Sequence, residues 1–201
     1  THPYGKSHEG RELEYLIITS EKNRERLDEI QKNNQRLADP RTINSTTAKK
    51  IIRENPGIYW LSYNVHGNEP SSSEASMLTA YTLVASKSKE IQDYLDNSII
   101  LIDPTINPDG RDRHTQWVNT YKGSPLVDDP QDAEHNEYWP GGRTNHYWFD
   151  LNRDLLLAIN PESRGKLAFH HNWYPNITID FHEMGTNSTY FFVPWRSEEH
   201  T

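Results

Sequence analysis

Short apolar runs alternate with segments of helical pattern, and this alternation limits the possible folds more than any other feature of the sequence. Residues 57–65 (GIYWLSYNV), 98–102 (SIILI) and 177–181 (ITIDF) are rich in aromatic and β-branched residues, which favours buried strands. Segments with helical spacing or helix-start signals lie between them. Strands that alternate with helices predict an α/β fold with helices on both faces of the sheet.

The remaining elements follow from the same patterns. We expect strands at residues 13–19 and 190–193 and helices at 89–95, 155–158 and 161–173. Residues 21–37 are expected to form an exposed helix or an ordered loop, residues 104–110 a turn-rich loop and residues 120–148 a long surface excursion. A further helix should begin near Pro70, because proline suits the first helical turn. Its expected apolar stripe comprises Met77, Leu78, Tyr81, Val84 and Ala85. Loops as long as the excursion are often functional.

Composition excludes several classes of protein. The 201 residues suffice for one core, and the 6 Trp, 11 Tyr and 5 Phe support a packed interior, so one domain is expected. A net charge of -8 without a basic stripe argues against nucleic acid as a partner. No run approaches the ~20 apolar residues of a membrane span, and residues 1–4 show no signal-peptide pattern. Because cysteine is absent, a transition metal must be held by His, Asp and Glu.

The first candidate metal ligands follow the strand at 57–65. His66 and Glu69 are three residues apart at a strand-to-helix corner, and imidazole and carboxylate both suit Zn²⁺. Gly67 is expected to let the backbone turn tightly between them. The alternative is a helix-capping glutamate near an unrelated histidine.

A third candidate ligand, His182, ends the strand at 177–181. A lone histidine in this position is more often structural. Taken together, however, His66, Glu69 and His182 make a His₂Glu set, which in catalytic zinc sites leaves a fourth position open. The combination is therefore more specific than either part.

Two further clusters carry polar side chains that suit a binding site. In residues 150–153 (DLNR), Arg153 and Asn152 can clamp a carboxylate, and Asp150 can accept the free N–H of a metal-bound imidazole. A surface salt-bridge cluster is the alternative. Residues 107–110 (NPDG) predict a tight turn, and Arg111 and Arg113 follow it, either near the site or on a solvated helix face.

The order HGNE, NPDG, DLNR and then a strand-terminal histidine resembles the zinc carboxypeptidase family related to carboxypeptidase A. The resemblance extends from about Gly5 to Trp195. It implies a three-layer α/β/α sandwich around a mixed, mostly parallel sheet, and a peptide or protein substrate with a free C-terminal carboxylate. By analogy with bacterial relatives, it also implies a secreted or periplasmic location.

The resemblance also implies roles for individual residues. One Zn²⁺ per chain is expected on His66, Glu69 and His182, with Asp150 behind the first histidine. Asn152 and Arg153 match the pair that binds the terminal carboxylate of the substrate, which makes the enzyme a metallocarboxypeptidase. The family's carbonyl-polarising arginine is expected at Arg113, with Arg111 as the second choice.

The sequence departs from the family pattern after His182. Family members carry a catalytic glutamate on a later strand, and neither Glu198 nor Glu199 in the polar tail matches it. We therefore expect residues 1–201 to be part of a single catalytic domain that is inactive alone. Two alternatives stay open: a zinc amidohydrolase acting on N-acyl amino acids or peptidoglycan stem peptides, and a non-catalytic module that binds zinc or carboxylate.

Overall fold

The structure, a computed structural model, describes residues 1–185 and contains one mixed sheet. Its strands, in the order β1-β2-β4-β3-β5, are β1 (His2–Lys6), β2 (Glu12–Ile18), β4 (Ser98–Asp103), β3 (Gly57–Tyr63) and β5 (Ile177–Phe181). Strand β3 pairs in parallel with both β4 and β5, whereas β2 pairs antiparallel with β1 and β4. All strands except β2 therefore run in one direction, which confirms the expected mixed, mostly parallel sheet.

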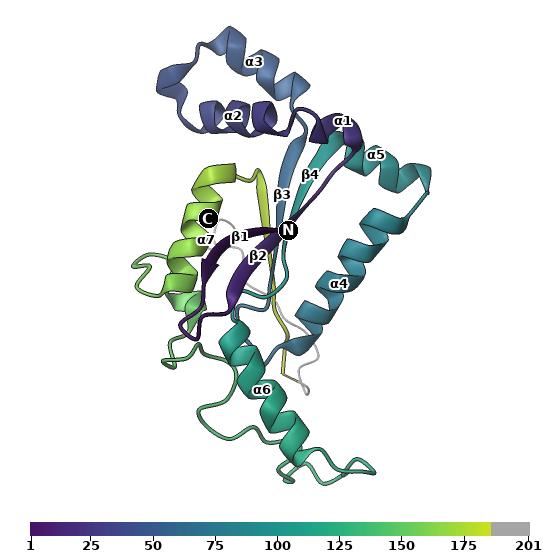
Figure 1. Ribbon diagram of the computed structural model, residues 1–201, viewed down its shortest axis with the longest axis vertical. Coiled ribbons are helices and arrows are strands. Elements are labelled where there is room, and N and C mark those ends of the chain that lie inside the picture. Colours follow the sequence, from purple (N-terminus) through teal and green to yellow (C-terminus); the bar gives the residue numbers. More distant parts are fainter. Residues whose placement is uncertain (186–201) are drawn as a thin grey trace, which may run out of the picture.

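Helices cover both faces of this sheet. They are α1 (Glu21–Arg24), α2 (Leu27–Ala38), α3 (Ser45–Glu54), α4 (Pro70–Ala85), α5 (Lys89–Asn97), α6 (Pro108–Tyr121) and α7 (Pro161–Trp173), with short 3₁₀ turns η1 (Pro40–Thr42) and η2 (Leu151–Arg153). Helices α4 and α5 lie on one side of the strands and α7 lies on the other (Figure 1). The three-layer arrangement agrees with the expected α/β/α sandwich. Among the described residues, no helix has the length and hydrophobicity that crossing a membrane requires.

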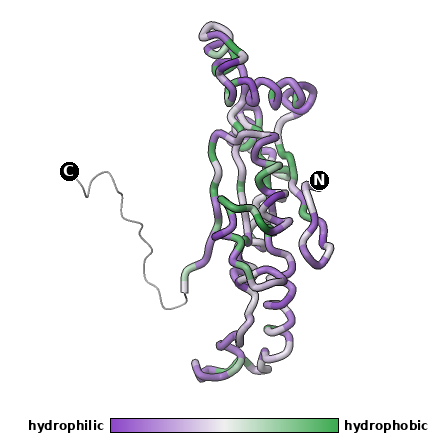
Figure 2. The backbone as a smooth tube through the Cα atoms, turned by 90° about the vertical axis from the view of Figure 1, so that its left-hand side faces the viewer, coloured by the Kyte–Doolittle hydropathy of each residue, from purple (hydrophilic) through white to green (hydrophobic). Residues whose placement is uncertain are grey.

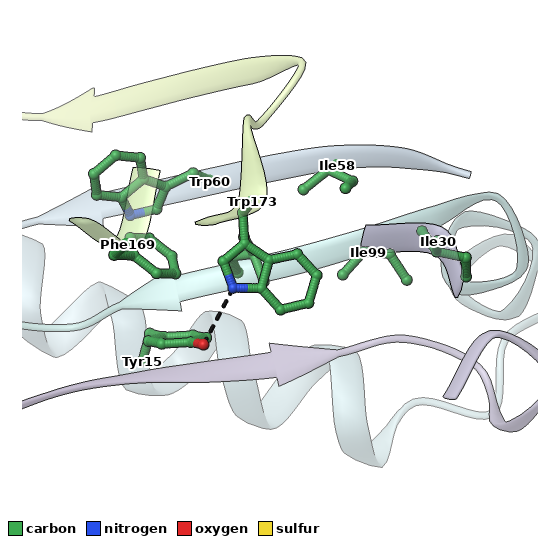
Figure 3. Close-up of a cluster of buried hydrophobic side chains, with 8 residues drawn as sticks. Tyr15, Ile30, Ile58, Trp60, Ile99, Phe169 and Trp173 are labelled. Carbon is green, nitrogen blue, oxygen red and sulfur yellow. Dashed lines mark hydrogen bonds between the residues drawn. The ribbon is translucent and has the colours of Figure 1, made fainter. Parts of the chain in front are cut away.

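The main core lies between the sheet and α7. Trp60 of β3 packs against Phe169 of α7 with ring centroids 4.8 Å apart, and Tyr15 of β2 lies 4.3 Å from the same ring. The indole N–H of Trp173 donates to the hydroxyl of Tyr15 at 3.1 Å (Figure 3). Burying each such side chain contributes roughly 1.5–3 kcal/mol. Figure 2 shows the hydrophobic residues gathered along the central strands, with mainly hydrophilic segments towards the two ends of the molecule.

Most of the expected elements are present, with five differences. The segment 21–37, expected as an exposed helix or an ordered loop, forms the two helices α1 and α2. The segment 155–158 is not helical and contains a turn at residues 155–157, and the expected loop at 104–110 ends in the first turn of α6. Strand β1 and helix α3 were not expected from the sequence. The strand expected at 190–193 lies outside the described residues.

The apolar stripe of α4 is the clearest correction. Met77, Leu78, Tyr81 and Val84 are between 59% and 72% exposed, and Ala85 is exposed as well. The buried side chains of α4 are instead three serines and one leucine: Ser72, Ser73, Ser76 and Leu83. Helical periodicity located this helix correctly, but it assigned the wrong face to the interior of the described structure.

Candidate metal centre

The three predicted ligands meet at the C-terminal edge of the sheet. His66 follows β3, Glu69 is the N-cap residue of α4, and His182 follows β5 directly. Strands β3 and β5 are parallel and pair Tyr63 with Phe181, so both strands end at the same level. This register brings together His182 and Glu69, which are 113 residues apart in the sequence.

Both imidazoles turn the same nitrogen toward the Glu69 carboxylate. His66 Nδ1 lies 2.8 Å from Glu69 Oε1, and His182 Nδ1 lies 3.2 Å from Glu69 Oε2. One ligand atom from each of the three residues fits within 4.8 Å of the other two. Two Nδ1 atoms and a carboxylate are a donor set that zinc accepts, so the residues present fit the metal that the sequence predicts.

Each histidine also has an aspartate on its opposite nitrogen. His66 Nε2 lies 3.1 Å from Asp150 Oδ1, and His182 Nε2 lies 2.9 Å from Asp180 Oδ2. A carboxylate behind an imidazole favours the tautomer with its proton on Nε2, which leaves the Nδ1 lone pair free for a cation. Asp150 occupies the place expected from the sequence, whereas Asp180 was missed. Side-chain alternation could have indicated it, because residues 180 and 182 share one side of a strand.

The charges at the site favour ionised carboxylates. Burial raises the pKa of Glu69, but the contact with His66 and the hydrogen bond from the Glu183 N–H outweigh it and hold the pKa below its ordinary value. Burial likewise raises the pKa of Asp150, but the hydrogen bond from the Asn152 N–H and the nearby His66 and Arg143 outweigh burial. The pKa of Asp150 is therefore also below its ordinary value. Both groups therefore stay negative at neutral pH and are ready to face a cation.

Asn64 shapes the corner that carries His66 and Glu69. It adopts a positive φ of 57° at the end of β3 and is completely buried. Its side-chain N–H group donates to the carbonyl of His66 at 2.8 Å and to that of Glu69 at 3.0 Å. Asparagine tolerates this left-handed conformation better than most residues, so one residue both turns the chain and fixes the two ligands' backbone.

Gly67 lies in the tight turn that we expected, which the Glu69 N–H closes by donating to the His66 carbonyl at 3.1 Å, and it also serves close packing. The described glycines with positive φ are Gly10 and Gly141, so Gly67 has an ordinary backbone conformation. A Cβ at Gly67 would lie 2.1 Å from the backbone N of Arg111, and a Cβ at Gly110 would lie 2.4 Å from the carbonyl O of Gly142. Backbone therefore packs on backbone where the loop after β3, the start of α6 and the loop after α6 meet.

Residues 107–110 begin a helix and do not form an isolated turn. Asn107 is the N-cap of α6, and its side-chain oxygen accepts the Gly110 N–H at 3.0 Å. Its side-chain nitrogen donates to the carbonyls of Arg143 and Val65. This buried asparagine therefore joins α6 to the loop after β3 and to the long loop that precedes η2.

The two arginines expected to face the substrate are engaged elsewhere. Arg113 donates to the carbonyls of Gly141 at 2.7 Å and Asn145 at 2.8 Å, and so fixes the loop that follows α6. Arg111 pairs with Glu74 on α4. Among residues 1–185, neither side chain has a recorded contact with the His66, Glu69 and His182 cluster.

Arg143 reaches this cluster, although it was not expected from the sequence. Its guanidinium lies 3.4 Å from His66 Nδ1 and 3.9 Å from Glu69 Oε1, and it donates to Asp150 Oδ2 at 3.0 Å. About half of its side chain, 46%, remains exposed. In the sequence it is a single arginine within a loop rich in Gly, Pro and Asn, so no local pattern distinguished it.

Glu137 holds the loop on which Arg143 lies. Its carboxylate accepts the N–H of Gly142 at 2.7 Å, the side-chain amide of Asn68 at 2.8 Å and a contact from His114 Nδ1 at 2.9 Å. Asn68 belongs to the same corner as two of the candidate ligands. The Glu137 carboxylate therefore links the long excursion at 120–148 to the corner that carries His66 and Glu69, and it also holds Gly142, the residue that precedes Arg143.

Asn152 and Arg153 lie beside the cluster and differ in their engagement. The side-chain nitrogen of Asn152 is 3.4 Å from His182 Nε2, and its backbone N–H donates to Asp150 at 2.9 Å. Arg153 is exposed, and its recorded hydrogen bond within residues 1–185 goes to the carbonyl of Asn152. Its guanidinium therefore keeps donors that can receive an anion.

Asp154 anchors the turn that carries this pair. Its carboxylate accepts the N–H of Ile159 at 3.0 Å and both the N–H and the side-chain amide of Asn160 at 2.9 Å, and only 4% of the residue is exposed. Burial raises the pKa of Asp154, but these hydrogen bonds outweigh it and lower the pKa to about 2.

We expect Asp154 to stabilise the fold in a pH-dependent way. Because its folded pKa is below the ordinary value, its contribution is present above about pH 4 and is lost as the pH falls towards 2. A shift of this size corresponds to about 2 kcal/mol. Urea unfolding of wild type and Asp154→Asn between pH 6 and about 2 measures it. The difference in unfolding free energy between wild type and Asp154→Asn should shrink as the pH falls. A difference that stays constant over this pH range contradicts the stabilising role of the ionised Asp154. Asp96→Asn, at an exposed aspartate of α5, is the control.

A His₂Glu donor set at the carboxyl edge of a mixed α/β sheet defines a candidate metal-binding protein of the α/β class. The sequence pattern of the family described as zinc carboxypeptidase matches residues 1–198. The chain therefore belongs to the zinc carboxypeptidase family. No curated protein matches the sequence.

Solved structures share the fold at low sequence identity. Thrombin activatable fibrinolysis inhibitor matches 98% of this chain and 46% of its own, with a TM-score of 0.57 and 14% identity. The match with a metallo-carboxypeptidase from Pseudomonas aeruginosa covers 89% of this chain and 33% of that protein, with a TM-score of 0.52 and 17% identity. The match with carboxypeptidase A from Helicoverpa armigera covers 92% of this chain and 40% of that protein, with a TM-score of 0.50 and 16% identity. The chain thus spans less than half the length of these solved proteins.

Proposed function

We propose that this chain forms the zinc-binding part of a metallocarboxypeptidase, a hydrolase that removes the C-terminal residue of peptides or proteins. One observation carries the proposal: Nδ1 of His66 and Nδ1 of His182 converge on the Glu69 carboxylate, and the exposed Arg153 follows Asn152, whose side chain contacts His182. We propose one zinc ion per chain on these three ligands. Membership of the zinc carboxypeptidase family supports the same activity.

The chain's own residues would prepare the site for this reaction. When bound, zinc supplies a Lewis acid that polarises the scissile carbonyl and lowers the pKa of a water molecule. Asp150 and Asp180 hold the two imidazoles with Nδ1 turned inward. Arg143 replaces our expectation of Arg113 or Arg111 as the group that stabilises the negative charge developing on the carbonyl oxygen, because among these three arginines its guanidinium lies beside the cluster. Arg113 holds the Arg143 loop.

Recognition of the substrate's C-terminus is assigned to Asn152 and Arg153. A guanidinium forms paired, charge-assisted hydrogen bonds with a carboxylate, and an amide adds a neutral donor. Since Asn152 is 3.4 Å from His182, a carboxylate held by this pair lies close to the ligand cluster. That short separation suits cleavage of the last peptide bond.

We propose that the general base lies outside residues 1–185. Near the cluster, Glu69 is a ligand, Asp150 and Asp180 face the imidazoles, and the Glu183 side chain contacts Ser71. Glu198 and Glu199, which we did not expect to be the base, lie outside the described residues. We further propose that the chain belongs to a single catalytic domain that acts in a secreted or periplasmic location, as the family resemblance implies.

The test compares matched peptides with a free or an amidated C-terminus, using the longest natural form of the protein. We expect C-terminal residues to be released much faster from free than from amidated peptides, and we expect the release to be lost with a chelator and recovered with zinc. Arg153→Ala should lower kcat/KM for free peptides by roughly 10- to 100-fold, the value of a charge-assisted hydrogen bond of about 1.5–3 kcal/mol. It should leave the slow reaction of amidated peptides unchanged.

Other outcomes would favour the alternative functions. An Arg153→Ala enzyme that still strongly prefers free C-termini contradicts the role of Arg153. Hydrolysis of N-acyl amino acids or peptidoglycan stem peptides, without release of C-terminal residues from ordinary peptides, favours a zinc amidohydrolase. Zinc binding without any hydrolysis favours a non-catalytic binding module. Arg36→Ala, at an exposed arginine of α2, controls for the loss of one positive charge.

A further inference from the structure

Helix α4 starts at a metal ligand and therefore lacks an ordinary cap. Its N-cap residue is Glu69, whose side chain makes no capping hydrogen bond because its carboxylate faces His66 and His182. The first N–H groups of a helix have no partner within the helix and need another acceptor. In this structure the Glu69 carboxylate is turned toward the two histidines and leaves the start of the helix without a side-chain cap from its own N-cap residue.

Glu183 supplies the missing acceptor from a distant part of the chain. Its Oε1 accepts the backbone N–H of Ser71 and the hydroxyl of Ser71, both at 2.6 Å. Ser71 and Glu183 are 112 residues apart in the sequence. A carboxylate at the N-terminus of a 16-residue helix is also favoured by the helix dipole.

The backbone of Glu183 makes the reciprocal contact. Its N–H donates to Glu69 Oε2 at 3.0 Å, the oxygen that His182 Nδ1 also approaches. Glu69 and Glu183 therefore each accept a backbone N–H from the other's segment. His182 lies immediately before Glu183, so this double connection holds the third ligand against the first two.

We propose that Glu183 is a positioning residue of the metal centre, whose side chain ties the end of β5 to α4 and so sets the separation of His182 from Glu69. This inference rests on the proposed zinc site. In the sequence Glu183 adjoins a ligand, but its side chain contacts the start of α4 and not the ligand cluster. It acts through the ligands and does not touch substrate.

The experiment measures zinc affinity by competition with a chromophoric chelator, and the absorption spectrum of the cobalt-substituted protein, using the whole chain. Glu183→Ala should weaken zinc binding by about 10-fold, within the 10- to 100-fold range typical of residues that support metal ligands, and should change the cobalt spectrum. Glu183→Gln keeps an acceptor oxygen and should recover part of the affinity. Adding Ser71→Ala to Glu183→Ala should cause little further loss, because both changes break the same contact.

Glu90→Ala is the matched control, because Glu90 is also an acidic residue in the first turn of a helix. It should leave zinc affinity unchanged. If Glu183→Ala lowers only the melting temperature, with wild-type zinc affinity and cobalt spectrum, Glu183 is a helix cap alone and the inference is overturned. A wild-type chain that binds no zinc overturns the proposed function as well. If the longest natural form of the protein binds zinc but cleaves no peptide, the result counts against the proposed function only.

Discussion

Replacing His182 with alanine is expected to weaken zinc binding by more than about 100-fold, beyond the loss that follows from changing a residue behind a ligand. The wild-type chain should hold about one zinc after dialysis, because two imidazole nitrogens and a carboxylate lie within 4.8 Å of one another. His182→Ala leaves only His66 and Glu69, and two ligands cannot enclose the cation. Elemental analysis measures the zinc content per chain, and competition with a chelator measures the zinc affinity.

The control for this substitution is His171→Ala. His171 is an exposed histidine on α7 and is not part of the ligand cluster, so its loss should not change the zinc content. Circular dichroism establishes that both variants are folded. If His182→Ala retains about one tightly bound zinc per folded chain, residues 66–69 and residue 182 do not form one site, and the proposed ligand set is wrong.

Replacing Arg143 with alanine is expected to lower kcat by about 10²- to 10³-fold, the effect of removing one donor that stabilises an oxyanion. Zinc affinity should stay the same or increase slightly, because a positive charge 3.4 Å from His66 Nδ1 opposes a bound cation. Steady-state kinetics of the longest natural form of the protein on a peptide with a free C-terminus, with zinc affinity titrated in parallel, separates these two effects. Arg143→Lys should restore only part of kcat, since a single ammonium does not match the planar guanidinium.

Arg113→Ala provides the comparison, because Arg113 was expected from the sequence to fill this role. Its guanidinium donates to the carbonyls of Gly141 and Asn145 on either side of Arg143. Its removal should therefore loosen the loop, with a smaller loss of kcat and a lower melting temperature. A large loss of kcat in Arg113→Ala together with near-normal kcat in Arg143→Ala would reverse the assignment.

Local patterns were sufficient for the central strands and for most helices. The runs at 57–65 and 98–102 became β3 and β4, because dense β-branched and aromatic residues favour burial between layers. The run at 177–181 became β5 as predicted, although most of this strand is exposed in the described structure. Strand β1 has no such run, and its partner is β2. Nothing in residues 2–6 alone predicts a strand, since the pairing with β2 supplies its stability.

The sequence also predicted the three candidate metal ligands, but it did not predict the residues that hold those ligands in place. His66, Glu69 and His182 bear side chains suited to zinc and follow strands, so their place at the sheet edge followed from the fold class. Asp180 and Glu183 have roles only in relation to other segments, through His182 and Ser71. An acidic residue beside a histidine has too many ordinary explanations for a sequence to distinguish.

The sequence did not predict which arginine lies beside the ligand cluster. Spacing after residues 107–110 favoured Arg113, whereas the structure directs Arg113 to loop carbonyls and brings Arg143 to the ligands. This exchange depends on Gly142, whose backbone packs on Gly110, and on the anchor that Glu137 provides. The path of a long loop depends on contacts with distant backbone, and these leave no periodic pattern in the sequence.

The sequence by itself determined the α/β class, the three candidate ligands and the family resemblance, because burial and metal chemistry each require particular residue types at particular strand ends. Only the tertiary structure decided which charged groups surround those ligands. Arg143 and Asp180 reach the cluster, while Arg111 pairs with Glu74 instead. The physical reason is that hydrogen bonds between charged side chains act over about 3 Å, so the folded backbone selects each partner from many residues of the same type.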